Sequence, residues 1–276
     1  MAGSVQAAYD VLTPPGGAAV GVLVHVPHGA LAIPPTERSR LLVNDAELAQ
    51  ELLLMTDRYT PELVARSVEL GGTVLVNRVS RLVVDPERFP DDADEPMARV
   101  GMGAVYTRTH DGRPLRSADA DERTRLLAAY FEPYARAATD LAAGFLERFG
   151  RCLVIDAHSF PARPLRYELS QDPDRPAICI GTDEFHTPEA LVQAIERICR
   201  ERGASTERNF PFAGTYVPLP FWRREPRVTS VMIEVRRDTY MDEATGARSA
   251  AFEETQALVG EILEVTIATW TALAPQ

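Results

Sequence analysis

Residues 152–157 read CLVIDA, and His158 follows directly. A short, unbroken apolar run of this kind is typical of a strand that is buried on both faces of a sheet. Residues 18–26, AAVGVLVHV, repeat the pattern, and a Pro-His-Gly turn containing His28 comes next. Further short apolar strands are expected at residues 73–79, 177–181 and 228–236.

Helical spacing of apolar residues occupies the intervals between these strands. Helices are expected at residues 45–70 with a break before Pro61, at 119–149 with a kink or split at Pro133, at 187–202, and at 250–273. Thr187 is the expected N-cap of the third helix. Residues 1–17 read as a lead-in segment, and residues 88–112 read as a long surface loop.

Strands that alternate with helices predict a three-layer α/β/α sandwich with a mixed, mostly parallel sheet. The length of 276 residues fits a single domain over residues 1–276. Active sites in such folds gather at the carboxyl ends of the strands. Functional side chains are therefore expected where each strand ends.

Composition excludes several classes of function. The formal net charge of -11 argues against binding to nucleic acids or to anionic membranes, because both repel an acidic surface. The chain contains no lysine, so all 29 basic residues are arginines. Schiff-base catalysis by lysine and phosphate-loop nucleotide hydrolysis are therefore excluded.

The three cysteines, Cys152, Cys179 and Cys199, all lie in apolar contexts and form no CxxC pair. This usage is typical of thiols packed as small hydrophobic residues in a reducing compartment. The first residues show no secretory signal, and no apolar run is long enough for a membrane-spanning helix. A cytoplasmic location is expected.

Two of the five histidines follow expected strands: His28 follows the first, and His158 follows the strand at 152–157. Imidazole is a common zinc ligand, and two or three protein ligands with an open position make a catalytic site. Asp156 could point to the opposite face or support a ligand. Because the HxxE, HExxH and HxH signatures are absent, a purely structural hydrogen-bonding role remains open for both histidines.

Glu234 lies inside an apolar strand, SVMIEVRRDTY. Burying a carboxylate there is unfavourable unless it is paired or functional. Glu234 is therefore a candidate general base with a raised pKa, or else the partner of Arg236 or Arg81 in an ion pair. Asp57, near the end of an apolar helical segment, is on its own a polar helix-end residue.

Three arginines surround Asp85 in NRVSRLVVDPERF, namely Arg78, Arg81 and Arg88. Clustered arginines can bind a substrate carboxylate through paired hydrogen bonds, with Asp85 orienting one of them. A surface network of salt bridges is the alternative.

Six segments of the chain resemble the N-formylglutamate amidohydrolase family. They are VPHGALAIP, MTDRYTPEL, VNRVSRLVVDPERF, VIDAHSFP, NFPFAGTYVPL and VMIEVRRDTYMDE, in the order found in the family and over roughly residues 22 to 243. The resemblance implies a zinc-dependent hydrolase with a phosphorylase/hydrolase-like fold, similar to zinc carboxypeptidases and aspartoacylases.

The resemblance also implies roles for individual residues. It makes His28, Asp57 and His158 metal ligands and Glu234 the catalytic base. It assigns substrate binding to a further set: Arg81, Asp85, Arg88, Asn209 and Gly214. Two positions depart from the family pattern, because Glu87 replaces the asparagine of DLNR and Thr215 replaces the second of two paired glycines.

The function expected from the resemblance is cleavage of the N-formyl, or a related N-acyl, amide of a small anionic amino-acid derivative such as N-formyl-L-glutamate, with release of formate. Two alternatives stay open. One is a zinc N-acyl amino acid deacylase or carboxypeptidase-like hydrolase with another substrate, suggested by Glu87. The other is a non-catalytic protein that binds an acidic metabolite.

Overall fold

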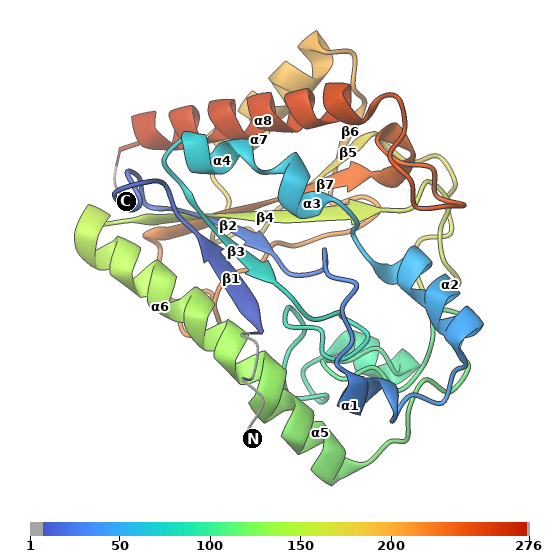
Figure 1. Ribbon diagram of the computed structural model, residues 1–276. Helices are drawn as coiled ribbons and strands as arrows, with labels where there is room; N and C mark the ends of the chain where they lie inside the picture. Colours follow the sequence, from blue (N-terminus) through green and yellow to red (C-terminus); the bar gives the residue numbers. More distant parts are fainter. Residues whose placement is uncertain (1–7, 275–276) are drawn as a thin grey trace.

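Seven strands form one mixed sheet in the computed structural model, which describes residues 8–274 (Figure 1). The strands are β1 (Tyr9–Leu12), β2 (Val22–Val26), β3 (Thr73–Asn77), β4 (Cys152–Phe160), β5 (Ile178–Gly181), β6 (Thr206–Arg208) and β7 (Val228–Arg236). Their order is β1-β3-β2-β4-β7-β5-β6. Only β1 with β3 and β5 with β7 are antiparallel pairs, which confirms the mixed, mostly parallel sheet.

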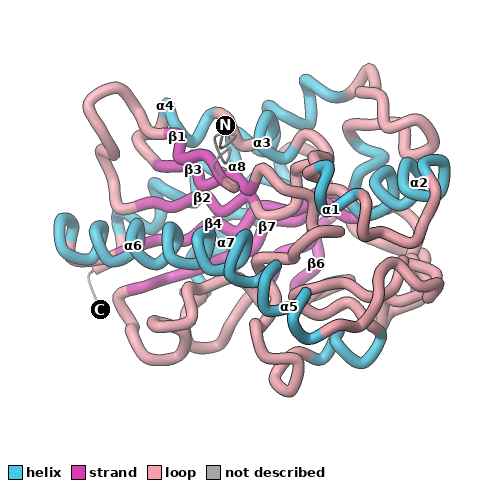
Figure 2. Tube along the Cα trace, turned by 60° about the horizontal axis from the view of Figure 1, so that its bottom comes forward, coloured by secondary structure: helices cyan, strands magenta, loops and turns pink. Residues whose placement is uncertain are grey.

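Helices cover both faces of this sheet. On one side lie α5 (Ala120–Leu126), a π-helical turn (Leu127–Phe131) and α6 (Glu132–Phe149); on the other lie α3 (Thr60–Leu63), α4 (Arg66–Glu69), α7 (Glu189–Glu201) and α8 (Phe252–Ala272) (Figure 1). Two further helices, α1 (Pro35–Arg38) and α2 (Asp45–Met55), stand beyond the strands among long loops (Figure 2). The predicted three-layer sandwich is confirmed.

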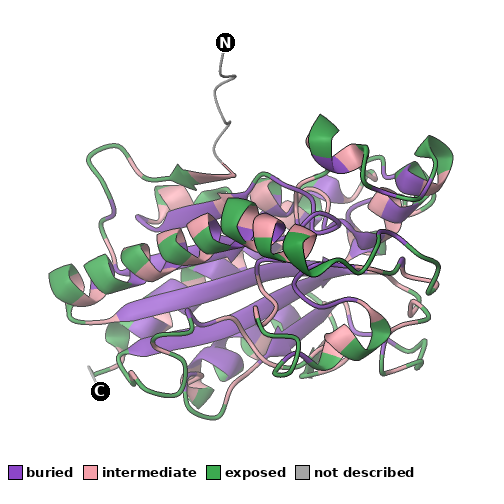
Figure 3. Cartoon of the chain, turned by 90° about the horizontal axis from the view of Figure 1, so that it is seen from below, coloured by how far each residue is buried: buried purple, intermediate pink, exposed green. Residues whose placement is uncertain are grey.

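The two long central strands are buried on both faces, as Figure 3 shows. Side chains alternate between the faces of a strand. On β4, Ile155 and Ala157 pack in the core beneath α7 and α8, whereas Cys152 and Val154 pack against α6. Asp156 and His158 continue along the α6 face, toward the carboxyl end of the strand, where the loops gather.

Several predicted boundaries were wrong. The strand expected at 18–26 begins at Val22, and β4 continues to Phe160, so His158 lies inside the strand. The extension follows from pairing with β7, which runs as far as Phe160 opposite Arg236. Residues 45–70 form three helices rather than two segments, and the first break leaves residues 56–59 as a turn.

Two strands were missed, and one predicted helix cap was wrong. β1 and β6 are short, partly exposed edge strands without an apolar run, so periodicity gives no signal for them. The segment expected as a lead-in thus contains β1, and its first seven residues lie outside the described part of the chain. Thr187 does not cap α7; its hydroxyl donates a hydrogen bond to the Ser230 carbonyl.

The expected split near Pro133 is confirmed. Pro133 lies at the start of α6 and has no N–H for the helical ladder, and the preceding turn takes π spacing. Among residues 8–274, none of the helices is both long and apolar enough to cross a membrane.

Close packing between β5 and the loop around Gly214 gives a test of the fold. A Cβ at Gly181 would overlap the Gly214 carbonyl oxygen and the Met232 side chain. We expect Gly181→Ala to lower the free energy of unfolding by about 1–3 kcal/mol in denaturant titrations. Gly144→Ala is the control, because its Cβ would meet no atom within 4 Å on an exposed helical face and should stabilise by about 0.5–1 kcal/mol. Equal stabilities for the two variants would contradict this packing.

Candidate metal and active site

Four separate segments bring the candidate residues together at the carboxyl ends of the central strands. His28 follows β2, and the parallel register of β4 and β7 places His158 directly beside Glu234. Asp57 lies in the turn between α2 and α3, and its backbone N–H donates a 3.0 Å hydrogen bond to the His28 carbonyl. The predicted ligands and the predicted base therefore share one site, although the chain between them is long.

Three of these side chains point one atom each toward a common point. The Nδ1 atoms of His28 and His158 are 3.2 Å apart. Asp57 Oδ2 lies 3.2 Å from the Nδ1 of His158 and 3.7 Å from that of His28. Ligands bound tetrahedrally to zinc at 2.0–2.1 Å stand about 3.3 Å apart. The three atoms are therefore spaced as zinc ligands are.

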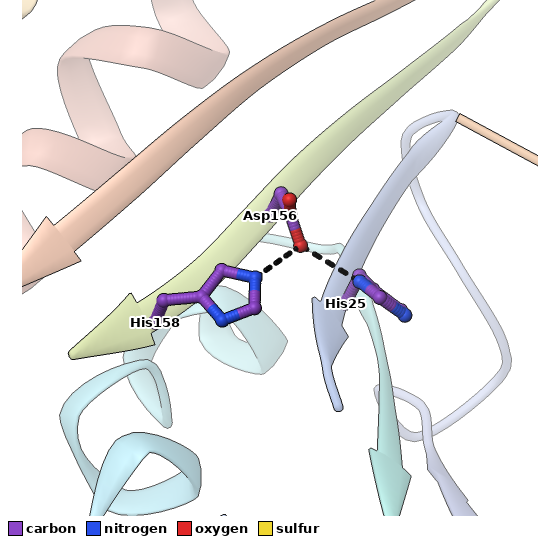
Figure 4. Close-up of side chains that lie close together, drawn as sticks. All are labelled: His25, Asp156 and His158. Carbon is purple, nitrogen blue, oxygen red and sulfur yellow. Dashed lines mark hydrogen bonds and ion pairs between the residues drawn. The ribbon is translucent and has the colours of Figure 1, made fainter. Parts of the chain in front are cut away.

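The other nitrogen of each ring meets a buried carboxylate. His28 Nε2 is 2.8 Å from Asp85 Oδ1, and His158 Nε2 is 2.9 Å from Asp156 Oδ1. Asp156 also contacts His25 Nδ1 at 2.7 Å, as Figure 4 shows, and accepts a hydrogen bond from the backbone of Tyr216. Carboxylates in this position orient metal-binding histidines and leave the opposite nitrogen free for the metal.

Arginines hold two of the acidic side chains. Arg81 pairs with Asp85 at 2.8 Å, and Arg237 pairs with Asp57 at 2.8 Å. Burial alone would raise the pKa of Asp57, but hydrogen bonds from the histidines and the charge of Arg237 hold that pKa well below its usual value. Burial likewise opposes ionisation of Asp85, whose pKa is held well below its usual value by His28 and Arg81.

Glu87 approaches the histidines from their Nε2 side. Its carboxylate oxygens lie 3.2 Å from His158 and 3.6 Å from His28. Burial alone would lower the pKa of His158, but the charges of Glu87 and Asp156 hold it well above its usual value. His28, His158 and Glu87 also lie close enough to hold a metal ion, as do His25, Asp156 and His158. The surplus of carboxylates around two histidines favours a bound cation.

Glu234 differs from the neighbouring carboxylates because, among the described residues, it forms no ion pair with an arginine or a histidine. Its side chain is buried, and Oε2 has no hydrogen-bond partner among the described residues. Burial raises the pKa of Glu234 to about 8. The alternative of an ion pair with Arg236 or Arg81 was wrong, because Arg236 pairs with Asp238 and Arg81 with Asp85. A carboxyl group in this state can exchange a proton near neutral pH.

The floor of a cavity of about 1060 Å³ is formed by His28, Asp57, Glu87, His158 and Glu234. Of the residues expected to bind substrate, Arg81, Arg88 and Gly214 line the cavity. Arg81 is already engaged by Asp85 and by the Tyr106 hydroxyl. Arg88 is less engaged: its nearest carboxylate oxygen, on Asp85, is 3.6 Å away, and its buried Nε has no hydrogen-bond partner among the described residues. Arg88 is thus the more available cation.

Two expected substrate-binding residues lie outside the cavity lining. Asp85 is fully buried beneath it and contacts His28 and Arg81 instead. Asn209 is exposed, and its side chain donates to the Thr182 hydroxyl and accepts from the backbone of Thr182 and Gly214. Both side chains therefore hold other parts of the site in position.

Three contributors were missed in the sequence. His25 lies within the apolar run 18–26, which gives no sign of a polar role, but the parallel register of β2 and β4 places it beside Asp156. Arg237 lies three residues after Glu234 in the segment VMIEVRRDTYMDE, but nothing in the sequence indicated that it would pair with Asp57. Glu87 stood out only as a departure from the family pattern; its reach toward both histidines required the structure.

This fold, with two histidines and a protonatable carboxyl group at the carboxyl ends of its central strands, fits the class of hydrolases. The chain matches the N-formylglutamate amidohydrolase family over residues 20–241. It therefore belongs to that family, whose members act on amide bonds, and the expected family and fold are confirmed.

Individual members of this family are similar to the chain over most of its length. N-formylglutamate deformylase from Pseudomonas aeruginosa is 31% identical over 260 residues, which cover 90% of this chain and 93% of that protein. The enzyme of the same name from Pseudomonas putida is 26% identical over 91% of this chain and 93% of its own length. The crystal structure of N-formylglutamate amidohydrolase from Ralstonia eutropha JMP134 superposes with a TM-score of 0.85 at 25% identity, covering 97% of this chain and 100% of that one.

The raised pKa of Glu234 predicts how stability depends on pH in metal-free protein. Glu234 keeps its proton up to about pH 8, whereas glutamate normally loses it near 4.5. Between these values the folded state holds a proton that the unfolded state lacks, so stability falls as pH rises. In chelator-treated protein, Glu234→Gln should remove about 3–5 kcal/mol of this fall in denaturant titrations.

Glu184→Gln, at an exposed position, is the matched control and should follow the wild-type curve. Parallel curves for wild type and Glu234→Gln across this pH range would refute the assignment of a buried, protonated carboxyl group.

Proposed function

We propose that the protein is a zinc-dependent amidohydrolase that cleaves the N-formyl, or a related N-acyl, amide of a small acidic amino-acid derivative such as N-formyl-L-glutamate. The products are formate, or the corresponding carboxylate, and the free amino acid. The observation that carries this proposal is the triangle of His28 Nδ1, His158 Nδ1 and Asp57 Oδ2 beside the unpaired carboxyl group of Glu234.

The donor set suits zinc. Two imidazole nitrogens and one carboxylate oxygen form a three-ligand set with an open position, the arrangement of catalytic zinc sites. We assign His28, Asp57 and His158 as ligands, with Asp85 and Asp156 orienting the two rings. When bound, the ion supplies Lewis-acid chemistry, which polarises a carbonyl group and a water molecule.

Glu234 is the general base in this scheme. It takes a proton from the attacking water as the new C–O bond forms, and then gives a proton to the departing amine as the C–N bond breaks. Its pKa near 8 in the metal-free site suits it to both steps, since the proton is neither tightly held nor fully lost near neutral pH. Burial keeps competing water away from the carboxyl group.

Arg88 is the residue that we assign to the substrate carboxylate. Arg88 lines the cavity together with the metal-binding side chains, and its buried Nε has no hydrogen-bond partner among the described residues. Arg81 and Asp85 act indirectly, because Arg81 fixes Asp85 and Asp85 fixes His28. The three buried free cysteines support a reducing, cytoplasmic setting for the enzyme.

Loss of His158 tests the metal-dependent scheme. Purified wild-type protein should hold about one zinc ion per chain by mass spectrometry and release formate from N-formyl-L-glutamate. His158→Ala should lose the metal and lower kcat/KM by about 1000-fold or more. His110→Gln is the control, because His110 pairs with Glu51 away from the cavity lining. A metal-free wild type that is unaffected by His158→Ala would overturn the proposal.

Asp57 and Glu87 compete for the place of third ligand, and a pair of amide variants separates them. We expect Asp57→Asn to weaken zinc affinity by more than about 100-fold and Glu87→Gln by less than about tenfold in chelator competition. The reason is that Asp57 meets the facing Nδ1 atoms, whereas Glu87 meets nitrogens already bound to Asp85 and Asp156. The reverse order of affinities would assign Glu87 as the ligand.

A second candidate is an N-acyl amino acid deacylase with a different substrate. The observation that favours it is the negative charge of Glu87, one residue from Arg88 and within the cavity lining. This charge disfavours a second substrate carboxylate at that place. A wide preference for N-formyl-L-glutamate over other N-acyl amino acids would count against this candidate.

A further inference from the structure

The cavity extends well beyond the histidines and Glu234 at its floor. An apolar wall, which we define as Phe89, Pro90, Leu127, Phe131, Leu219 and Trp222, lines the same cavity as the histidines, Glu234 and Arg88. These side chains come from three segments: the loop after Asp85, the π-helical turn, and the loop that precedes β7. The ring centroids of Phe89 and Trp222 are 5.5 Å apart, so two of the segments meet.

Helix α6 shows how far the cavity extends. Glu132, Ala135, Arg136 and Thr139 line it, and their spacing places them on one face of the helix. Seven residues of α-helix cover about 10 Å. The cavity therefore continues along α6, well beyond the polar groups that would hold an amide and a carboxylate.

Part of the wall is open to solvent. Leu219 and Trp222 are 43% and 37% exposed, and Leu169, which also lines the cavity, is 97% exposed. Large apolar side chains gathered at the mouth of a cavity mark a surface that a ligand covers. N-formylglutamate is a doubly anionic molecule of about a dozen non-hydrogen atoms with only two methylene groups, so it offers the wall little apolar surface and leaves most of a drug-sized cavity unfilled.

From this geometry, and resting on the amidohydrolase chemistry of the proposed function, we infer that the cavity takes an N-acyl amino acid that carries a large apolar group in preference to N-formyl-L-glutamate. Its carboxylate pairs with Arg88, its amide lies over the floor near Glu234, and its apolar group lies along the wall formed by Phe89, Leu219 and Trp222. The reaction is unchanged, because water still adds to the amide carbonyl and the C–N bond still breaks. The new element is the apolar group of the substrate that contacts the wall. The apolar group can belong to the acyl chain or to the amino acid.

Two substrate series test the inference and separate these two sources. The first extends the acyl group on one amino acid, from N-formyl- through N-hexanoyl- to N-decanoyl-L-glutamate, with release of the free amine as the readout. The second keeps the formyl group and changes the amino acid from glutamate to methionine and phenylalanine. We expect kcat/KM to rise at least tenfold in one series, because each buried methylene contributes roughly a fourfold gain.

Matched variants locate the effect. Trp222→Ser should reduce the preference for the apolar substrate over N-formyl-L-glutamate by at least tenfold. Phe185→Ser should leave that preference unchanged, since Phe185 is similarly exposed, at 44%, but does not line the cavity. Preference that is flat across both series, or highest for N-formyl-L-glutamate, overturns the inference while leaving the proposed function intact.

A binding assay tests the inference even if no amide is cleaved. Glu234→Gln keeps the cavity but lacks the base, so calorimetric titration with N-decanoyl-L-glutamate, N-formyl-L-phenylalanine and N-formyl-L-glutamate compares affinities directly. We expect one of the two apolar compounds to bind at least tenfold more tightly than N-formyl-L-glutamate, with a negative heat-capacity change, and less tightly when Trp222→Ser is added. Equal affinities for all three compounds overturn the inference. Tight binding of an apolar compound, with no hydrolysis of any of the three by the zinc-loaded wild type, upholds the apolar site and refutes the amidohydrolase proposal instead.

Discussion

The parallel pairing of β4 with β7 is the constraint on which the site depends. Nine residue pairs run from Cys152 opposite Val228 to Phe160 opposite Arg236, and His158 stands opposite Glu234 within them. Both strands reach beyond their shorter neighbours, and His158 and Glu234 near their carboxyl ends line the cavity. A slip of one residue would turn Glu234 toward the core beneath α8. The strand register thus fixes both the spacing and the burial of these two candidate residues.

The acidic side chains stay charged in this buried place because each has a specific cationic or hydrogen-bonding partner. Arg81 and the Tyr106 hydroxyl hold Asp85, and Arg237 holds Asp57. An unpaired buried charge would be strongly unfavourable. Among the described carboxyl groups at the cavity floor, Glu234 lacks such a partner, and its pKa is raised to about 8. The same interior therefore supplies fixed anions for a cation and one exchangeable proton.

The sequence predicted the layers and the central strands, and it pointed to several side chains that the structure brings together, because burial and strand ends leave a local pattern. β7 was predicted with its observed bounds, and His28, His158 and Glu234 were singled out at or near the ends of expected strands. Local pattern carries no information on which distant side chains meet. The pairing of His25 with Asp156, the approach of Glu87 to both histidines and the surface position of Asn209 all depend on register and loop geometry.

The position of β7 also has a consequence for how the protein is made. β7 follows β5 and β6 in the chain, yet it lies between β4 and β5 in the sheet. β5 pairs with β6 and β7 but not with β4, so the two halves of the sheet have no strand in common until residues 228–236 have left the ribosome. Synthesis from the N-terminus therefore exposes the edges of β4 and β5 while the last part of the chain is still being translated, and such edges invite aggregation. The strand that carries Glu234, the proposed base, is also the one that closes this gap.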